Sequence, residues 1–174
     1  MKRRMLFLMA SSIPGGVLAQ GKEDVTDHYW SIGKSKVTAE ASGYDDVDMD
    51  GFGVNLVVFS KYSKVGYGAS FDYAHEDNST PFDHDEESAW SFSFILGLRP
   101  VDWLVIKPMI GITIFEAELN YNYSENGLMY GIGTTAEIPS TNIFLDASYK
   151  VHHVGGLVED LETSSTFIGI GYKF

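Results

Sequence analysis

The sequence predicts an all-β fold, an eight-stranded antiparallel up-and-down transmembrane β-barrel. Three observations lead to this prediction. Apolar residues alternate with small or polar residues along seven segments, short and long connections alternate between the segments, and the apolar parity carries almost no charge. The chain has 174 residues, the length of one domain, with 14% aromatic residues and 18 glycines. This composition favours strands and tight turns over a helix bundle.

The overall charge excludes several kinds of partner and site. The sequence holds 24 acidic and 12 basic residues, and its net charge is −12. Such a chain repels nucleic acid and other polyanions, so we expect no nucleic acid partner. Because there is no cysteine, the fold has neither disulfides nor cysteine-ligated metal sites.

The first residues have the pattern of a secretory signal peptide. A basic stretch at residues 2–4 precedes an apolar stretch at 5–10, and small or modest residues precede Gln20. We therefore expect residues 1–19 to be removed on export and residues 20–174 to form the barrel. The apolar stretch is too short to anchor the chain in a membrane by itself.

Seven segments show the period of two that is typical of strands with different faces. Their apolar sides begin at Phe52, Val65, Trp90, Leu104, Leu128, Ile143 and Ile168. An eighth segment, around residues 29–40, is less clear because Lys34 and Lys36 share the parity of Trp30 and Ile32.

The opposite parity carries glycine, serine and threonine together with a few charges of both signs. This composition fits a narrow barrel lumen, whereas the bulky, uncharged parity fits contact with lipid. A closed barrel is the one sheet that can cross a bilayer, because an open edge leaves backbone groups without hydrogen bonds. The predicted interior polar network comprises Asp72, Arg99, Lys107, Glu137, Asp146, Lys150 and Lys173.

The connections alternate in length, as they do in membrane barrels with short periplasmic turns and long external loops. A soluble lipocalin-like barrel is the alternative, but it does not predict this strict alternation. The short connections are residues 60–64, 99–102 and 139–142, and the long ones are 41–49, 75–87, 117–127 and 152–164.

The last residues and several internal motifs resemble those of a known family. Tyr172 and Phe174, after alternating isoleucines, resemble the assembly signal that the barrel assembly machinery of bacteria reads. The chain as a whole resembles the Ail/Lom/OmpX family of eight-stranded outer-membrane proteins. The motifs that carry this resemblance are residues 51–56, 68–73, 102–103, 130–133 and 145–149.

The resemblance implies a monomeric barrel in the bacterial outer membrane, with a packed polar interior, no open channel, and contact with outer-membrane lipid and lipopolysaccharide. Several members of the family promote adhesion, invasion or resistance to complement, so host or serum proteins are candidate partners. Two departures concern the ligand. Val57 and Phe59 stand where members often carry basic residues, and the loops are acidic where relatives that bind heparin or lipopolysaccharide use basic patches.

One acidic stretch matches the start of a calcium-binding loop. Asp46, Asp48 and Asp50 alternate before Gly51, so their carboxylates could converge on a Ca²⁺ ion. The twelfth position is Val57, where such loops carry a bidentate glutamate, and the segment runs into a strand. An ordinary acidic surface loop is therefore the alternative, and no other cofactor is expected. Residues 75–87, rich in His, Asp and Glu, are likewise either metal ligands or a solvated charge run.

The third long connection is the predicted partner-binding loop, because Tyr121, Tyr123 and Tyr130 lie in it or beside it and tyrosine is common at recognition surfaces. The sequence thus favours a non-enzymatic surface protein that displays four loops for adhesion or serum resistance. The first alternative is a structural envelope protein whose acidic loops bind divalent cations. The second is a lipid A-modifying enzyme, although none of the five histidines lies in a recognisable nucleophile motif.

Overall fold

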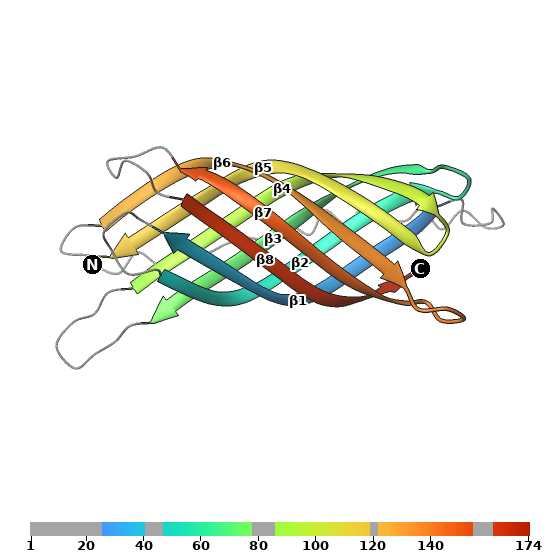
Figure 1. The fold of residues 1–174 in the computed structure, drawn as a ribbon, viewed down its shortest axis with the longest axis horizontal. Helices are drawn as coiled ribbons and strands as arrows, with labels where there is room; N and C mark the ends of the chain where they lie inside the picture. Colours follow the sequence, from blue (N-terminus) through green and yellow to red (C-terminus); the bar gives the residue numbers. More distant parts are fainter. Residues whose placement is uncertain (1–25, 41–46, 78–85, 119–121, 155–161) are drawn as a thin grey trace, which may run out of the picture.

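The chain forms a closed barrel in which each strand pairs with its neighbours in the sequence and β8 pairs with β1 (Figure 1). The computed structural model describes residues 26–40, 47–77, 86–118, 122–154 and 162–174. Its strands are β1 (Thr26–Glu40), β2 (Val47–Ser60), β3 (Val65–Asp77), β4 (Glu86–Val101), β5 (Leu104–Glu118), β6 (Asn122–Glu137), β7 (Ile143–Val154) and β8 (Glu162–Lys173). The predicted eight-stranded antiparallel barrel is confirmed.

The predicted signal peptide, residues 1–19, lies outside the described residues. Within the described part of the chain, no helix is long and apolar enough to cross a membrane.

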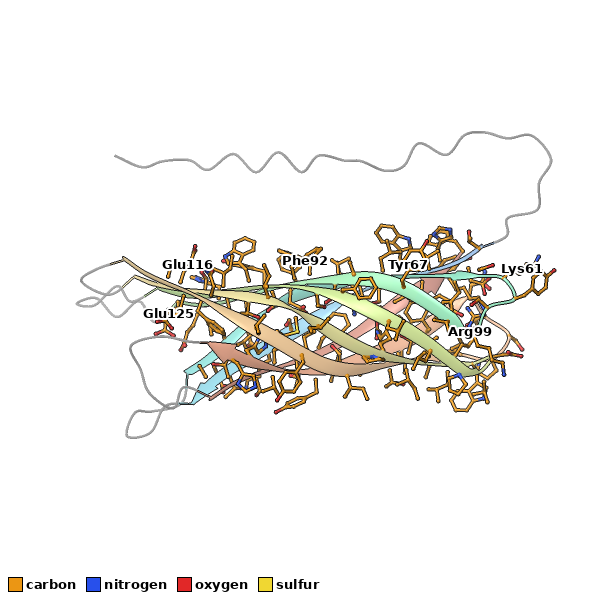
Figure 2. The ribbon with its side chains drawn as sticks, turned by 90° about the horizontal axis from the view of Figure 1, so that it is seen from above. Lys61, Tyr67, Phe92, Arg99, Glu116 and Glu125 are labelled. Carbon is orange, nitrogen blue, oxygen red and sulfur yellow. The ribbon has the colours of Figure 1, made fainter. Side chains whose placement is uncertain are left out.

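The alternation in the sequence becomes the two faces of the barrel wall. Large apolar side chains of the predicted parity lie outside, such as Ile168, which is 71% exposed, and Phe92, which is 57% exposed. Figure 2 shows Phe92 and Tyr67 pointing away from the barrel. The exposure of an apolar band around a closed sheet is what a membrane barrel requires, because lipid then replaces water on that face.

The two ends of the barrel differ in their connections. Three short turns, at residues 61–64, 102–103 and 138–142, lie at the same end as Phe174 (Figure 1). We call this the turn end, and the opposite end the loop end. Lys61 and Arg99 lie at the turn end and Glu116 and Glu125 at the loop end (Figure 2).

The third long connection is much shorter than predicted. β5 continues to Glu118 and β6 begins at Asn122, so only residues 119–121 separate them. The reason is that the apolar signal stops before the strands do. Glu116 on β5 pairs with Ser124 on β6, and both side chains are exposed, so the outer face of this part of the hairpin is no longer apolar.

The first strand is regular although its sequence pattern is blurred. Lys34 and Lys36 share the outer face with Trp30 and Ile32, as their parity indicates. Each lysine forms an ion pair with an aspartate of the neighbouring strand β2, so strand pairing compensates for charges on a face that is otherwise apolar.

Glycines let aromatic rings come close to the inner wall where β8 closes on β1. A Cβ atom at Gly171 would lie 2.1 Å from a ring carbon of Phe144, and one at Gly169 would lie 2.6 Å from a ring carbon of Phe167. Both rings are almost fully buried. The absence of a side chain at Gly169 and Gly171 therefore makes room for these two rings in the lumen.

Candidate functional site

The possible functions of a small barrel depend on whether its lumen is open. The inward side chains are therefore described from the turn end to the loop end. At the turn end, a group of charges closes the mouth. Arg99 Nη2 lies 2.9 Å from Asp27 Oδ2, and Lys173 Nζ lies 3.2 Å from Glu137 Oε1 and 3.8 Å from Asp27 Oδ2. The Tyr29 hydroxyl donates a hydrogen bond to Glu137. The mouth thus holds two positive and two negative groups that neutralise each other.

Behind this mouth lies an apolar cluster. The guanidinium carbon of Arg99 is 4.3 Å from the ring centroid of Phe59, and the rings of Phe59 and Tyr29 meet edge to face at 5.6 Å. The prediction of a lumen faced by small and polar residues is therefore wrong for this region. The cluster consists of Tyr29, Val57, Phe59, Ile95, Val105, Met109 and Phe144.

Two buried ion pairs occupy the middle of the lumen. Lys107 pairs with Asp146, and Lys150 pairs with Asp72. All four residues are at most 3% exposed. Charges this deeply buried persist only when they are paired and hydrogen-bonded, because burial removes their hydration.

Asp146 is the centre of this polar region. Besides the Lys107 ammonium, its carboxylate accepts hydrogen bonds from Ser31 Oγ at 2.5 Å, Asn55 Nδ2 at 3.0 Å and Thr135 Oγ1 at 3.3 Å. The donors come from four strands, β1, β2, β5 and β6, whereas Asp146 lies on β7. The carboxylate therefore joins parts of the wall that are not neighbours.

The lumen is also occupied toward the loop end. Both ring nitrogens of His152 are hydrogen-bonded, Nδ1 with Thr113 Oγ1 at 2.5 Å and Nε2 with Ser165 Oγ at 2.9 Å. A second apolar cluster lies nearby, formed by Val37, Met49, Ala74 and Ala89 with Phe115 packed against it. Side chains of the described residues thus occupy the lumen at the turn end, in its middle and toward the loop end.

The structure places all seven residues of the predicted polar network on the inside of the barrel. They form three groups: Arg99 with Lys173 and Glu137 at the mouth, Lys107 with Asp146, and Lys150 with Asp72. Sequence reasoning missed Asp27, which pairs with both Arg99 and Lys173. The predicted first segment, residues 29–40, does not include Asp27, whereas β1 does. In the sequence, only its odd number, shared with Tyr29 and Ser31, indicates that Asp27 faces inward.

The predicted calcium ligands do not form a loop. Asp46 lies outside the described residues, and Asp48 and Asp50 lie on β2 with exposed side chains. Asp48 Oδ2 is 2.8 Å from Lys36 Nζ, and Asp50 Oδ1 is 3.0 Å from Lys34 Nζ. Across the described ranges, no three His, Asp or Glu side chains converge as ligands for a metal ion.

The predicted tyrosine loop is also corrected. Tyr121 lies outside the described residues, whereas Tyr123 and Tyr130 belong to β6. Tyr130 is on the outer face, 51% exposed, with its hydroxyl 3.3 Å from His153 Nε2. It therefore belongs to the lipid-facing wall, where tyrosine is typical of the zone near the membrane surface.

The described histidines do not form a catalytic arrangement with serine and an acid. His152 meets Ser165, but its second nitrogen meets Thr113, and all three side chains are enclosed in the lumen. His153, its neighbour in sequence, faces outward and meets Tyr130.

The final aromatic residues lie at the turn end and complete the pairing with β1. The amide of Phe174 donates to the carbonyl of His28 at 3.0 Å, and the amide of His28 donates to the carbonyl of Phe174 at 3.2 Å. The Tyr172 and Phe174 rings, 46% and 70% exposed, meet edge to face at 4.9 Å. Both rings are thus accessible from outside the barrel.

Comparisons with known proteins agree with this geometry. The crystal structure of Ail, the attachment invasion locus protein of Yersinia pestis, superposes with a TM-score of 0.73 at 19% identity, over 87% of this chain and all of Ail. Ail in complex with the heparin analogue sucrose octasulfate gives 0.70 at 20% identity, with coverages of 87% and 100%. Neisserial surface protein A gives 0.55 at 13% identity, over 84% of this chain and 97% of that protein. At these identities the likeness concerns the fold.

No curated protein matches the sequence. The family model described as "Outer membrane protein beta-barrel domain" matches residues 5–174, almost the whole chain. The protein is therefore a member of the outer-membrane β-barrel family, with an eight-stranded barrel of the Ail/OmpX kind.

Proposed function

We propose that this protein is a non-enzymatic surface barrel that presents its loop end to the surroundings of the cell, for adhesion to host cells or resistance to serum. The observation that carries the proposal is the filled lumen. A barrel whose interior is occupied by an apolar cluster and buried ion pairs supports neither transport nor chemistry inside, so its loop end is what remains for recognition.

The charge of the loop end indicates the kind of partner. Most of the 24 acidic residues lie in the stretches 34–50, 75–87, 116–125 and 152–162, which hold only two lysines, Lys34 and Lys36. Both lysines are paired with aspartates. Ail has been crystallised with a sulfated heparin analogue. The acidic loop end described here instead favours a basic surface on a protein partner, because it repels sulfate groups.

Serum survival and host-cell adhesion test this proposal. A sensitive laboratory strain displays either the native chain or variants in which residues 41–46, 78–85 or 155–161 are replaced by glycine and serine. These replacements leave every strand intact. A variant with residues 61–64 replaced in the same way is the control, because that turn is at the other end of the barrel. We expect survival or adhesion to fall in the loop variants and to remain in the control. Unchanged values in all loop variants, with surface display verified, would refute the proposal.

A second candidate function is the binding of divalent cations that link the protein to phosphate groups of lipopolysaccharide. The strand register favours it, because acidic residues face each other directly. Asp77 pairs with Glu86, and Glu86 also pairs with Glu118. Like charges in this arrangement destabilise a sheet unless a cation screens them.

Heat unfolding with and without Ca²⁺ distinguishes this second role. If a cation binds, Ca²⁺ raises the unfolding temperature of the native barrel, and the double variant Glu86→Gln/Glu118→Gln loses most of that increase. Asp102→Asn, in a turn at the other end, is the matched control and keeps it. An equal effect of Ca²⁺ on all three proteins would exclude specific binding at this row.

A further inference from the structure

The apolar outer wall of the barrel is much shorter on β1 than on β5. On β5, six successive outward positions are apolar, from Leu104 to Ile114. On β1, only Trp30 and Ile32 are apolar among the outward residues, and the next one toward the loop end is Lys34. Given about 3.3 Å per residue and a strand tilt of about 40°, the apolar wall is roughly 25 Å tall on β5 and about 5 Å tall on β1.

The strand register gives the relative heights of these two walls. Starting at Trp30, successive pairing partners lead around the barrel through Ile110 on β5 and return to β1 at Thr38, eight residues nearer the loop end. Ile110 is four strand pairs from Trp30 and four from Thr38, so it lies midway between their levels, at the level of Lys34. At this level the apolar wall of β5 still continues to Ile114. The wall therefore ends roughly 15 Å lower on β1 than on β5.

Polar residues of three adjacent strands, β8, β1 and β2, occupy the place that the apolar wall leaves on this side (Figure 1). We call this surface the polar notch. It consists of Lys34, Lys36, Thr38, Asp48, Asp50 and Thr166. Each side chain of its two ion pairs is at least 47% exposed. The lysines and aspartates neutralise each other, so the polar notch attracts water and polar groups without favouring ions of one sign.

The lysines of the polar notch extend toward the loop end. Lys34 is directly opposite Phe52, but its Nζ lies 3.0 Å from Asp50 Oδ1, two residues nearer the loop end. Lys36 is opposite Asp50, but its Nζ lies 2.8 Å from Asp48 Oδ2, again two residues nearer the loop end. Long cationic side chains of membrane proteins extend in this way toward the nearer polar interface. Their direction indicates that the polar notch is solvated from the loop end.

We propose that the membrane is thinner beside β1, so that water and lipid headgroups of the outer leaflet descend to the level of Lys34. This inference rests on membership of the outer-membrane barrel family, whose long loops are extracellular, and is independent of recognition by the loops. Charged side chains that face hydrocarbon are strongly unfavourable. A bilayer adapts to a short apolar wall by thinning locally, and the headgroups and water then solvate both ion pairs.

Tilting the whole barrel does not remove the mismatch. Trp30 is four residues nearer the turn end than Lys34 and thus lies at the level of Ile106. Ile106 is one outward position from Leu104, where the apolar wall of β5 begins. The two walls therefore begin at nearly the same level and differ at the loop end. A tilt raises one side and lowers the other without changing the height of either wall, so the lipid has to adapt beside β1.

Nitroxide labels test this proposal, because they report whether water or hydrocarbon surrounds them. The chain has no cysteine, so one introduced cysteine carries the single label. Thr166→Cys places the label in the polar notch, where Thr166 pairs with Lys36. Ile110→Cys is the matched control, within one residue of the same level on β5 and also exposed. The full chain is folded in vesicles of phosphatidylethanolamine and phosphatidylglycerol.

The collision rates of two relaxing agents give the result. We expect a water-soluble nickel complex to collide with the label several-fold more often at residue 166 than at residue 110. Oxygen, which concentrates in hydrocarbon, should show the opposite order. This comparison leaves both ion pairs of the polar notch in place.

Two variants in the Thr166→Cys background then test the cause. Lys34→Leu/Lys36→Leu/Asp48→Leu/Asp50→Leu extends the apolar wall, so the nickel collision rate should fall to the value at residue 110. Lys34→Gln/Lys36→Gln/Asp48→Asn/Asp50→Asn keeps polar groups at the same positions and should keep most of the nickel collisions. Both variants leave the net charge of the chain unchanged. If the leucine variant folds poorly, the comparison of residues 166 and 110 still decides.

Three results would overturn the proposal. Equal collision rates at residues 166 and 110, with oxygen favoured at both, would mean that the bilayer has the same thickness on both sides. Few collisions of either agent at residue 166, with dipolar coupling between labels, would mean that a second copy of the chain covers the polar notch. A label at Ile106→Cys that meets nickel as often as residue 166 would mean that the barrel tilts instead. The loop replacements in the serum assay leave the polar notch intact, so the two proposals can fail separately.

Discussion

Replacing Asp146 by alanine is the most direct test of the filled lumen. The substitution leaves the Lys107 ammonium, which is fully buried, without its counter-ion. It also removes the acceptor of hydrogen bonds from Ser31, Asn55 and Thr135. We therefore expect a barrel that folds but unfolds much more readily.

The magnitude follows from these contacts. Removing one partner of a buried ion pair costs about 3–5 kcal/mol, since the remaining charge keeps its desolvation penalty. The three uncharged donors add roughly 1 kcal/mol in total after the side chains relax, so we expect a loss of about 4–6 kcal/mol. The double variant Lys107→Met/Asp146→Leu removes both charges and should lose only about 1–3 kcal/mol. The double variant should thus be the more stable of the two.

Chemical unfolding of the barrel in lipid vesicles measures these values. Trp30 and Trp103 lie on the outside, 48% and 56% exposed, so their fluorescence reports the loss of lipid contact. Asp50→Asn is the control, because its ion pair with Lys34 is exposed and contributes little. A loss below about 1 kcal/mol for Asp146→Ala, the range of exposed ion pairs, would mean that water reaches this pair and would refute the filled lumen.

Three further predictions concern other parts of the barrel. Gly171→Ala places a methyl group against the ring of Phe144 and the backbone carbonyl oxygen of Trp30, and should lower the free energy of unfolding by about 1–3 kcal/mol, measured in the same assay. An unchanged value would mean that both neighbours move aside at no cost. Phe59→Ala empties part of the apolar cluster, and we expect a loss of about 3–5 kcal/mol. Phe174→Ser should reduce the amount of barrel in the outer membrane of cells, measured by surface labelling, and leave folding into detergent intact; equal cellular amounts would show that this residue is no assembly signal.

The strand pattern was predictable because membrane and lumen impose opposite demands on alternate residues. From Phe52 to Leu56 and from Ile168 to Tyr172, each apolar residue of the predicted parity lies outside. The pattern did not predict the strand ends beyond the apolar band at the loop end, where Glu116 on β5 pairs with Ser124 on β6 and both polar side chains are exposed. Hydrogen bonding continues there although the outer face is no longer apolar, so hydropathy alone cannot locate the ends of these strands.

The interior was predictable in kind and not in detail. Parity alone indicated that Lys107 and Asp146 face inward, but which acid meets which base depends on strand tilt and register across the lumen, which one sequence does not contain. The position of Phe59 also indicates an inward side chain, but the sequence does not show what its ring contacts. In the structure the ring of Phe59 packs against the guanidinium of Arg99 and the ring of Tyr29.

The cross-lumen hydrogen bonds of Asp146 have a consequence for the order of folding. Hairpin contacts join residues close in sequence, whereas Asp146 and Ser31 are separated by 115 positions and Asp146 and Asn55 by 91. Contacts of such high sequence separation form late, because a large loss of chain entropy precedes them. A strand that slips by one residue turns its inward charges toward lipid, which is strongly unfavourable. The buried charges therefore discriminate against misaligned closure, so that only the native register completes the last step of assembly.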